Sequence, residues 1–156
     1  MSPADLLDLC REKGLRIATA ESCTGGMISA ALTDIAGSSD VFERGFVTYT
    51  NTAKTEMLGV REATLAAHGA VSEQVAREMA LGALANSDAD LAVSVTGIAG
   101  PGGSEFKPEG RVCFGIASKG SCTTETVEFG AAGRAVVREK ARNHALALLA
   151  QAASQL

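Results

Sequence analysis

The feature that most constrains the fold of this chain is a glycine-rich junction near its N-terminus. The apolar residues 15–20 predict a short buried strand, and the run 27–32 predicts a helix. Between them lies the segment ESCTGG (21–26), so hydroxyl, thiol and glycine residues stand where a strand ends and a helix begins. Free backbone N–H groups and the helix dipole favour negative charge at such a junction. A nucleophile held there would have oxyanion donors close by.

The same alternation of strands and helices continues along the chain and predicts an α/β fold. Strands are expected at 15–20, 45–50, 91–96, 111–118 and 123–129. Helices are expected at 3–13, 27–35, 52–58 (capped by Asn51), 61–68, 73–84 and 133–156. Lys119-Gly120 joins the last two strands as a β-hairpin. We therefore predict a single three-layer α/β/α domain over residues 1–156, with a mixed, mostly parallel sheet and one C-terminal hairpin.

The composition is typical of a globular protein and argues against a nucleic-acid or membrane surface. Apolar residues make up 46% of the 156 residues, the formal net charge is −4, and aromatic residues make up only 4%. No run of Lys and Arg occurs, and no segment has the pattern of a signal peptide or a membrane span. We therefore expect a cytoplasmic protein. The four cysteines and two histidines show no metal-ligand spacing, so no metal site is expected.

Ligands of α/β sheets bind beyond the carboxyl ends of the strands, so the residues at those ends are candidates for chemistry. Ser22 follows the first predicted strand, Tyr49 lies at the end of the second, and Thr96 ends the third. A serine hydroxyl becomes a good nucleophile only when a neighbouring base takes its proton. His68 and His144 fall in helical stretches away from these ends, so neither is expected to be that base.

Lys54 is the best candidate for the base, because lysine replaces histidine in Ser-Lys hydrolases. It lies in the first turn of the helix that follows Tyr49. The amine must be neutral to accept a proton, so its pKa must fall from about 10.4 to near 7. Burial and the positive end of the helix both act in that direction. We expect Tyr49 to hydrogen-bond both Lys54 and Ser22 and to pass a proton to the leaving group.

Each of these residues has an ordinary structural interpretation when it is considered alone. Ser22 is a good helix cap, Lys54 a good surface residue of a helix, and Tyr49 a good half-buried residue of a strand. Cys23 is a rival nucleophile, although no histidine partner is in view. Only the joint occurrence of the three residues at neighbouring strand ends indicates catalysis.

Three runs of the sequence together resemble the CinA C-terminal domain family. They are TAESCTGG (19–26), YTNTAK (49–54) followed by MLGV (57–60), and VTGIAGPGG (95–103). Residues 71–73, 107–108 and 133–138 are also similar to the family, and the match keeps the family's order over nearly the whole chain. Thr50 and Thr52 stand where the family commonly has Ser and Glu, and Glu109 stands where it commonly has Val.

The resemblance implies a serine amidohydrolase that converts nicotinamide mononucleotide and water to nicotinic acid mononucleotide and ammonia. The family's nucleophilic serine matches Ser22, and its catalytic tyrosine and lysine match Tyr49 and Lys54. Substrate-binding groups are expected within the matching motifs and the last helix, at Glu21, Cys23, Thr24, Gly25, Gly26, Asn51, Thr96, Gly97, Ala99, Gly100, Arg134 and Arg138. Backbone N–H groups of residues 23–26 would stabilise the oxyanion, and the loop 96–103 with the two arginines would hold the substrate phosphate. No cofactor is expected.

Two other functions stay open at the level of sequence. A protein with these glycine loops could bind a nucleotide without turning it over. The family's competence and DNA-damage label suggests an interaction protein instead, although the acidic net charge provides no electrostatic footprint for DNA. The resemblance also favours a homo-oligomer that acts on a small molecule, and the acidic composition favours no nucleic-acid or membrane partner.

Overall fold

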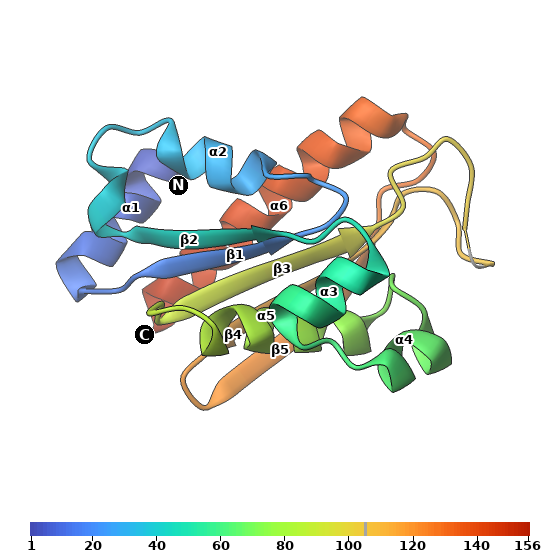
Figure 1. Ribbon diagram of the computed structural model, residues 1–156. Coiled ribbons are helices and arrows are strands. Elements are labelled where there is room, and N and C mark those ends of the chain that lie inside the picture. The colour runs from blue at the N-terminus through green and yellow to red at the C-terminus, as the bar shows by residue number, and fades with distance from the viewer. Residues whose placement is uncertain (105) are drawn as a thin grey trace.

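A five-stranded mixed sheet forms the centre of the structure, a computed structural model that describes residues 1–104 and 106–156 (Figure 1). The strands are β1 (Ile17–Glu21), β2 (Phe42–Val47), β3 (Leu91–Gly97), β4 (Arg111–Ser118) and β5 (Ser121–Glu128), and they lie in the order β2-β1-β3-β4-β5. β1 pairs in parallel with β2 and β3, whereas β4 pairs antiparallel with β3 and β5. Four strands therefore run in one direction, which confirms the predicted mixed sheet with a C-terminal hairpin.

Helices cover both faces of this sheet, as Figure 1 shows. One face carries α1 (Pro3–Lys13), α2 (Met27–Thr33) and the long α6 (Arg134–Gln155), which share one hydrophobic core with the strands. The other face carries α3 (Asn51–Leu58) and α5 (Glu73–Ala85), with α4 (Glu62–His68) packed on α5. A short 3₁₀ helix, Ser38–Asp40, precedes β2. The three-layer α/β/α architecture follows from these two cores.

The close packing of α3 on α5 depends on a glycine. A Cβ atom at Gly82 of α5 would lie only 2.0 Å from the carbonyl oxygen of Leu58, the last residue of α3. No side chain fits there without displacing backbone. The two helices therefore touch through their main chains, and this contact sets the position of α3 above the sheet.

The second strand begins and ends three residues earlier than predicted, at Phe42–Val47 rather than 45–50. Polar Glu43 and Arg44 concealed its beginning in the sequence, because an edge strand does not require continuous apolar residues. Their side chains reach the connection before β3, where Glu43 accepts the N–H of Asp88 and Arg44 donates to the carbonyl of Asn86. Thr50, rather than the expected Asn51, caps α3 by accepting the N–H of Ala53 at 3.1 Å.

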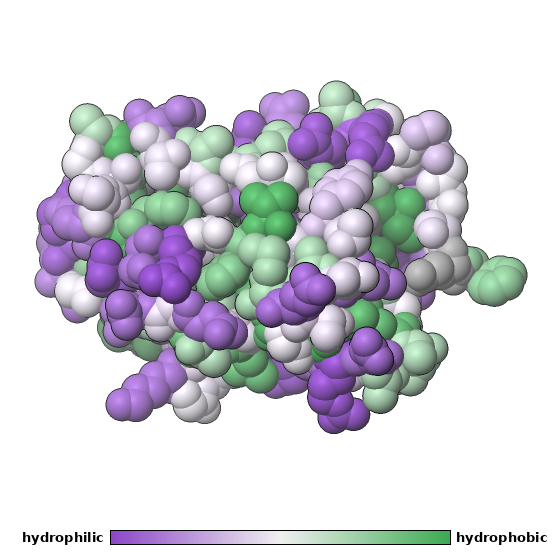
Figure 2. All heavy atoms as spheres, in the orientation of Figure 1, coloured by the Kyte–Doolittle hydropathy of each residue, from purple (hydrophilic) through white to green (hydrophobic). Residues whose placement is uncertain are grey.

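The carboxyl ends of β1, β2 and β3 meet at one edge of the sheet, close to the first turn of α6 and the segment 98–104 (Figure 1). Exposed apolar side chains occur on segments at this edge, at Val47, Tyr49 and Val136. Figure 2 shows one face of the molecule as a mosaic of hydrophilic and hydrophobic residues, with a hydrophobic group near its middle, over the end of β2. Among the described residues, no helix combines the length and hydropathy needed to cross a membrane.

Candidate active site

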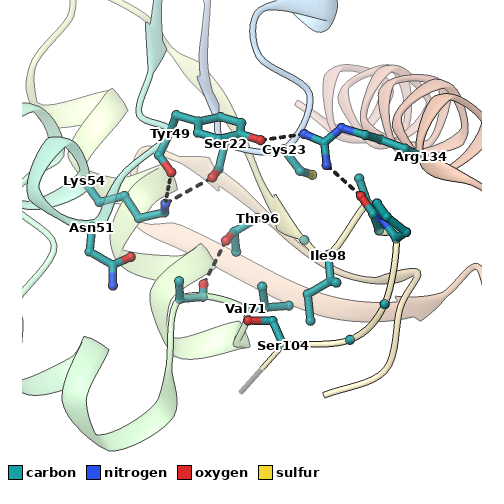
Figure 3. A pocket seen from close by; sticks show the side chains of 17 residues that line it. Ser22, Cys23, Tyr49, Asn51, Lys54, Val71, Thr96, Ile98, Ser104 and Arg134 are labelled. Atoms are coloured by element: carbon teal, nitrogen blue, oxygen red, sulfur yellow. Dashed lines mark hydrogen bonds between the residues drawn. The ribbon is translucent and has the colours of Figure 1, made fainter. Parts of the chain in front are cut away.

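A pocket opens where the three parallel strands end (Figure 3). Its volume of about 370 Å³ lies in the range of small-molecule sites. Ten of the predicted site residues line it: Ser22, Cys23, Tyr49, Asn51, Lys54, Thr96, Gly97, Ala99, Gly100 and Arg134. The lining also contains Ile98, Pro101, Gly102 and Gly103 from the loop expected to hold the phosphate, and Ala70, Val71 and Ser104, which were not predicted.

The serine and the lysine predicted to act together are in hydrogen-bond contact in this pocket. Lys54 Nζ lies 3.1 Å from Ser22 Oγ, although the two residues are 32 positions apart in the chain. Lys54 also donates to the main-chain carbonyls of Thr48 at 3.1 Å and Tyr49 at 3.5 Å. Both side chains are withdrawn from solvent, since Lys54 is 2% exposed and Ser22 is 7% exposed. Figure 3 shows the amine pointing at the hydroxyl.

Ordinary secondary structure holds this pair in place. Ser22 directly follows β1, and its N–H donates to the Val95 carbonyl of β3 at 3.0 Å, which fixes the start of the turn. Lys54 lies in the first turn of α3, where its N–H donates to the carbonyl of the cap residue, Thr50. The contact of α3 with α5 then sets how far the amine reaches toward the serine. The serine–lysine pair is thus held by the end of β1 and the first turn of α3.

Tyr49 lies at the mouth of the pocket, but its hydroxyl does not contact the serine and lysine as we had expected. It accepts a hydrogen bond from Arg134 Nη2 at 2.6 Å, and Arg134 Nη1 donates to the Gly100 carbonyl at 2.8 Å. Tyr49 follows the end of β2 and is 58% exposed, so its ring extends outward toward α6 (Figure 3). Its main-chain carbonyl accepts from Lys54 Nζ at 3.5 Å.

Glu21 lies outside the substrate pocket, contrary to its prediction as a substrate-binding residue. Its side chain is fully buried beneath the turn, and its carboxylate accepts the N–H groups of Gly26, Ile28 and Ser29. It also accepts the hydroxyls of Thr24 and Ser29. Gly26 is the N-cap residue of α2 and has no side chain with which to cap it. Glu21 supplies that cap from the end of β1, so it binds the protein rather than a ligand.

The prediction that the N–H groups of Gly25 and Gly26 stabilise the oxyanion is wrong, because both groups already donate hydrogen bonds within the protein. Gly26 N–H donates to Glu21, and Gly25 N–H donates to the Ser22 carbonyl at 3.0 Å. Thr24, Gly25 and Gly26 also lie outside the pocket lining. Among the described residues, the backbone N–H of Thr24 makes no hydrogen bond, and that of Cys23 lies against its own thiol, so no neighbouring residue binds either group next to the serine.

Arg138 lies behind the turn rather than in the pocket, which corrects its predicted role as a phosphate ligand. Its Nε donates to the Cys23 carbonyl at 3.0 Å, and its Nη2 lies 3.4 Å from the Thr24 carbonyl. Arg134, one helical turn earlier on α6, does line the pocket. The two arginines therefore differ in role even though both lie near the start of the same helix.

Cys23 is a poor rival to Ser22 as the nucleophile. Burial raises the pKa of its thiol to about 11, so the thiolate is scarce near neutral pH. The backbone N–H of Cys23 opposes this effect of burial on the pKa most, followed by the charges of Arg138 and Lys54, whereas the carboxylate of Glu21 adds to it. Cys23 does line the pocket, and its side chain there is a small apolar surface.

The glycine loop that closes the pocket is attached to the neighbouring connection between α4 and α5. Lys107 Nζ donates to the carbonyls of His68 and Val71, each at 2.6 Å, and Thr96 Oγ1 donates to the Ala70 carbonyl at 2.8 Å. These contacts explain why Ala70 and Val71 line the site. Sequence reasoning missed them because neither carries a reactive group, although the likeness of residues 71–73 to the family was a usable signal.

Neither histidine takes part in the site. His68 contributes a main-chain carbonyl, and the His144 ring contacts Glu125 and packs on Phe114 on the β4–β5 side of the sheet. Within the residues that the structure describes, no group of three or more His, Cys, Asp and Glu side chains is arranged to hold a metal ion.

Comparison with known proteins identifies a family and several close relatives. The model of the CinA C-terminal domain family matches residues 2–153. The chain is 50% identical over 159 residues to nicotinamide-nucleotide amidohydrolase PncC of Escherichia coli (strain K12), covering 97% of this chain and 96% of that protein. It is 62% identical over 112 residues to a CinA-like protein of Chloroherpeton thalassium, covering 71% of this chain but only 27% of that much longer protein.

Solved structures agree with the fold. The competence/damage inducible protein CihA from Agrobacterium tumefaciens has a TM-score of 0.85 at 49% sequence identity, with 96% of each chain covered. A competence-damaged protein (CinA) superfamily member from Klebsiella pneumoniae 700603 has a TM-score of 0.93 at 35% identity, with both chains fully covered.

Proposed function

Because the chain belongs to the CinA C-terminal domain family, we propose that it hydrolyses the carboxamide of nicotinamide mononucleotide, producing nicotinic acid mononucleotide and ammonia. The observation that carries this proposal is the buried contact of 3.1 Å between Lys54 Nζ and Ser22 Oγ, inside a pocket of small-molecule size. The name of the E. coli relative, which matches along almost its full length, supports the same reaction class.

In the proposed first step, neutral Lys54 takes the proton of the Ser22 hydroxyl as Ser22 Oγ bonds to the carboxamide carbon. A neutral amine has two N–H groups and one lone pair. Lys54 Nζ lies 3.1 Å from Ser22 Oγ and also reaches the carbonyls of Thr48 and Tyr49, so the neutral amine would lie within reach of the serine proton. The carbonyl π electrons move to oxygen, and the N–H groups of Cys23 and Thr24 stabilise the resulting oxyanion.

In the second step, the protonated Lys54 returns its proton to the amide nitrogen, the C–N bond breaks and ammonia leaves. Water then attacks the acyl ester while Lys54 removes one of its protons. The bond from carbon to Ser22 Oγ breaks, the acid product leaves, and Ser22 recovers its proton from Lys54.

The substrate phosphate is assigned to the mouth of the pocket. Arg134 is the cation of the lining that reaches both Tyr49 and Gly100, and guanidinium groups bind phosphate well. Backbone N–H groups of the glycine loop 97–103 are further donors. Asn51 lies in the same lining beside Lys54 and is assigned to the ribose or the carboxamide.

Three broader properties are proposed with this function. All four cysteines are unpaired, which fits a reducing compartment such as the cytoplasm. The net charge of −4 fits a small-molecule enzyme without a nucleic-acid partner. The exposed apolar side chains at the carboxyl edge, Val47 and Val136, fit a homo-oligomer, which light scattering coupled to size-exclusion chromatography measures directly.

The test is ammonia release from nicotinamide mononucleotide by the wild type, Ser22→Ala and Lys54→Met. Each substitution is expected to lower kcat by about 10³-fold or more, because nucleophile and base act as a unit. Lys140→Met removes an exposed lysine from α6 and is the matched control. Wild-type turnover by Ser22→Ala would overturn the proposal. A wild type that binds the mononucleotide but releases no ammonia would instead indicate a binding protein.

A further inference from the structure

Arg138 connects the last helix to the turn that carries the nucleophile. Its Nε donates to the Cys23 carbonyl and its Nη2 lies 3.4 Å from the Thr24 carbonyl, across more than 110 positions of sequence. These are the first two residues after Ser22. Arg138 does not line the pocket, and its guanidinium is directed at the main chain of the turn.

The contact fixes the direction of a peptide group. In a planar trans peptide the C=O and the N–H point in opposite directions. Because Arg138 holds the Cys23 carbonyl, the Thr24 N–H of the same peptide points away from α6. The preceding peptide is fixed separately, since the Ser22 carbonyl accepts the Gly25 N–H at 3.0 Å and thereby orients the Cys23 N–H.

The other N–H groups at this end of α2 are already used. Glu21 accepts those of Gly26, Ile28 and Ser29, and Gly25 donates within the turn. The two N–H groups whose directions are fixed are therefore the two beside Ser22 that no other described residue binds. From this geometry we infer that Arg138 is a positioning residue, which holds the Cys23–Thr24 peptide so that its N–H serves as an oxyanion donor.

Two further observations fit this role. A Cβ atom at Gly25, where φ is +58°, would lie 3.4 Å from Arg138 Nη2, so the turn leaves little space beside the guanidinium. Arg138 also brings a positive charge close to the turn, beneath which the carboxylate of Glu21 is buried. A guanidinium bound to a carbonyl polarises the peptide and makes its N–H a stronger donor.

The inference deepens the proposed function, so its test uses two reactions. The first is turnover of nicotinamide mononucleotide. The second is labelling by a fluorophosphonate, in which Ser22 Oγ bonds to phosphorus and fluoride leaves, with mass spectrometry locating the label. Ser22→Ala must stay unlabelled. The second reaction needs a nucleophile and an oxyanion site but no recognition of the mononucleotide.

Arg138→Gln is expected to lower both kcat and the labelling rate by about 10²-fold, with KM and the affinity for nicotinic acid mononucleotide nearly unchanged. Arg138→Lys keeps a single donor and is expected to fall between this variant and the wild type. Arg142→Gln removes a guanidinium one turn further along α6, where it faces Glu139 and Asn143, and is the matched control. Thermal unfolding of each variant measures the structural cost, and Arg138→Lys is tested even if Arg138→Gln does not fold.

Three results would overturn the inference. The first is a folded Arg138→Gln variant that keeps wild-type kcat and labelling. The second is a variant that loses product affinity while kcat is retained, because this would make Arg138 a phosphate ligand. The third is an Arg138→Lys variant indistinguishable from the wild type in both reactions. If the wild type is labelled at Ser22 but does not hydrolyse the mononucleotide, only the proposed substrate is contradicted. If the wild type reacts in neither assay, both the proposed function and the role of Arg138 are contradicted.

Discussion

At the scale of single residues, the site shows how position changes the chemistry of ordinary side chains. Ser22 and Cys23 are neighbours in one turn, and the serine hydroxyl lies 3.1 Å from Lys54 Nζ. The thiol is the better nucleophile in water, but burial raises the pKa of Cys23 to about 11 and keeps it protonated. The oxygen nucleophile is therefore favoured by the available base rather than by intrinsic reactivity.

This difference leads to a prediction for Cys23→Ala. The variant is expected to keep ammonia release within about threefold of the wild type, because the thiol contributes only apolar surface. Iodoacetamide is expected to alkylate Cys23 slowly at pH 8 and faster as the pH rises toward 11, where the thiolate forms. Mass spectrometry across this pH range measures the second effect. A loss of activity as large as that of Ser22→Ala would show that Cys23 takes part in the reaction.

At the scale of secondary structure, the end of one element completes the start of the next. The carboxylate of Glu21, the last residue of β1, accepts three main-chain N–H groups of the α2 N-terminus. An anion is favoured there by the helix dipole, and the buried donors would otherwise lack partners. The carboxylate of Glu21 therefore occupies the place that a bound anion would take at the N-terminus of α2. A developing oxyanion can be stabilised only by N–H groups at the start of the turn.

Glu21→Gln tests this cap. One side-chain oxygen would become an NH₂ group facing backbone N–H donors, so we expect the free energy of unfolding in urea to fall by about 2–4 kcal/mol. Glu12→Gln on the exposed side of α1 is the control and is expected to change it by less than about 0.5 kcal/mol. Equal stabilities of the two variants would contradict a capping role for Glu21.

At the scale of the whole molecule, the pocket is assembled from segments that are distant in the chain. Tyr49 follows β2, Gly100 belongs to the loop after β3, and Arg134 begins α6. The two hydrogen bonds of Arg134 join all three segments across the mouth of the pocket. The same guanidinium is the proposed phosphate ligand, so its position depends on the other two segments.

A double-mutant cycle measures this dependence. Tyr49→Phe and Arg134→Met are each expected to weaken the binding of nicotinic acid mononucleotide. The double variant is expected to be little worse than Arg134→Met alone, with a coupling energy of about 0.5–1.5 kcal/mol. Isothermal titration calorimetry provides the dissociation constants. Strictly additive losses would mean that the two side chains act on the ligand independently.

The residues of the site differ in how far the sequence predicts their roles. Ser22 and Lys54 were predicted from strand ends and from the known chemistry of serine–lysine pairs, and both line one pocket. Glu21, Gly25 and Gly26 were expected to bind substrate because they lie in the same motif. Membership of a motif does not distinguish a residue that contacts a ligand from one that supports the turn.

The sequence by itself determined the order of strands and helices and the chemical character of each junction, because periodicity, capping and turn formation act between residues close together in the chain. Only the tertiary structure decided which polar groups were consumed and which stayed available. That outcome depends on Glu21 folding under its own turn and on Arg138 approaching Cys23 from the last helix. Hydrogen-bond donors are divided among acceptors by distance in space, and sequence separation carries no information about that distance.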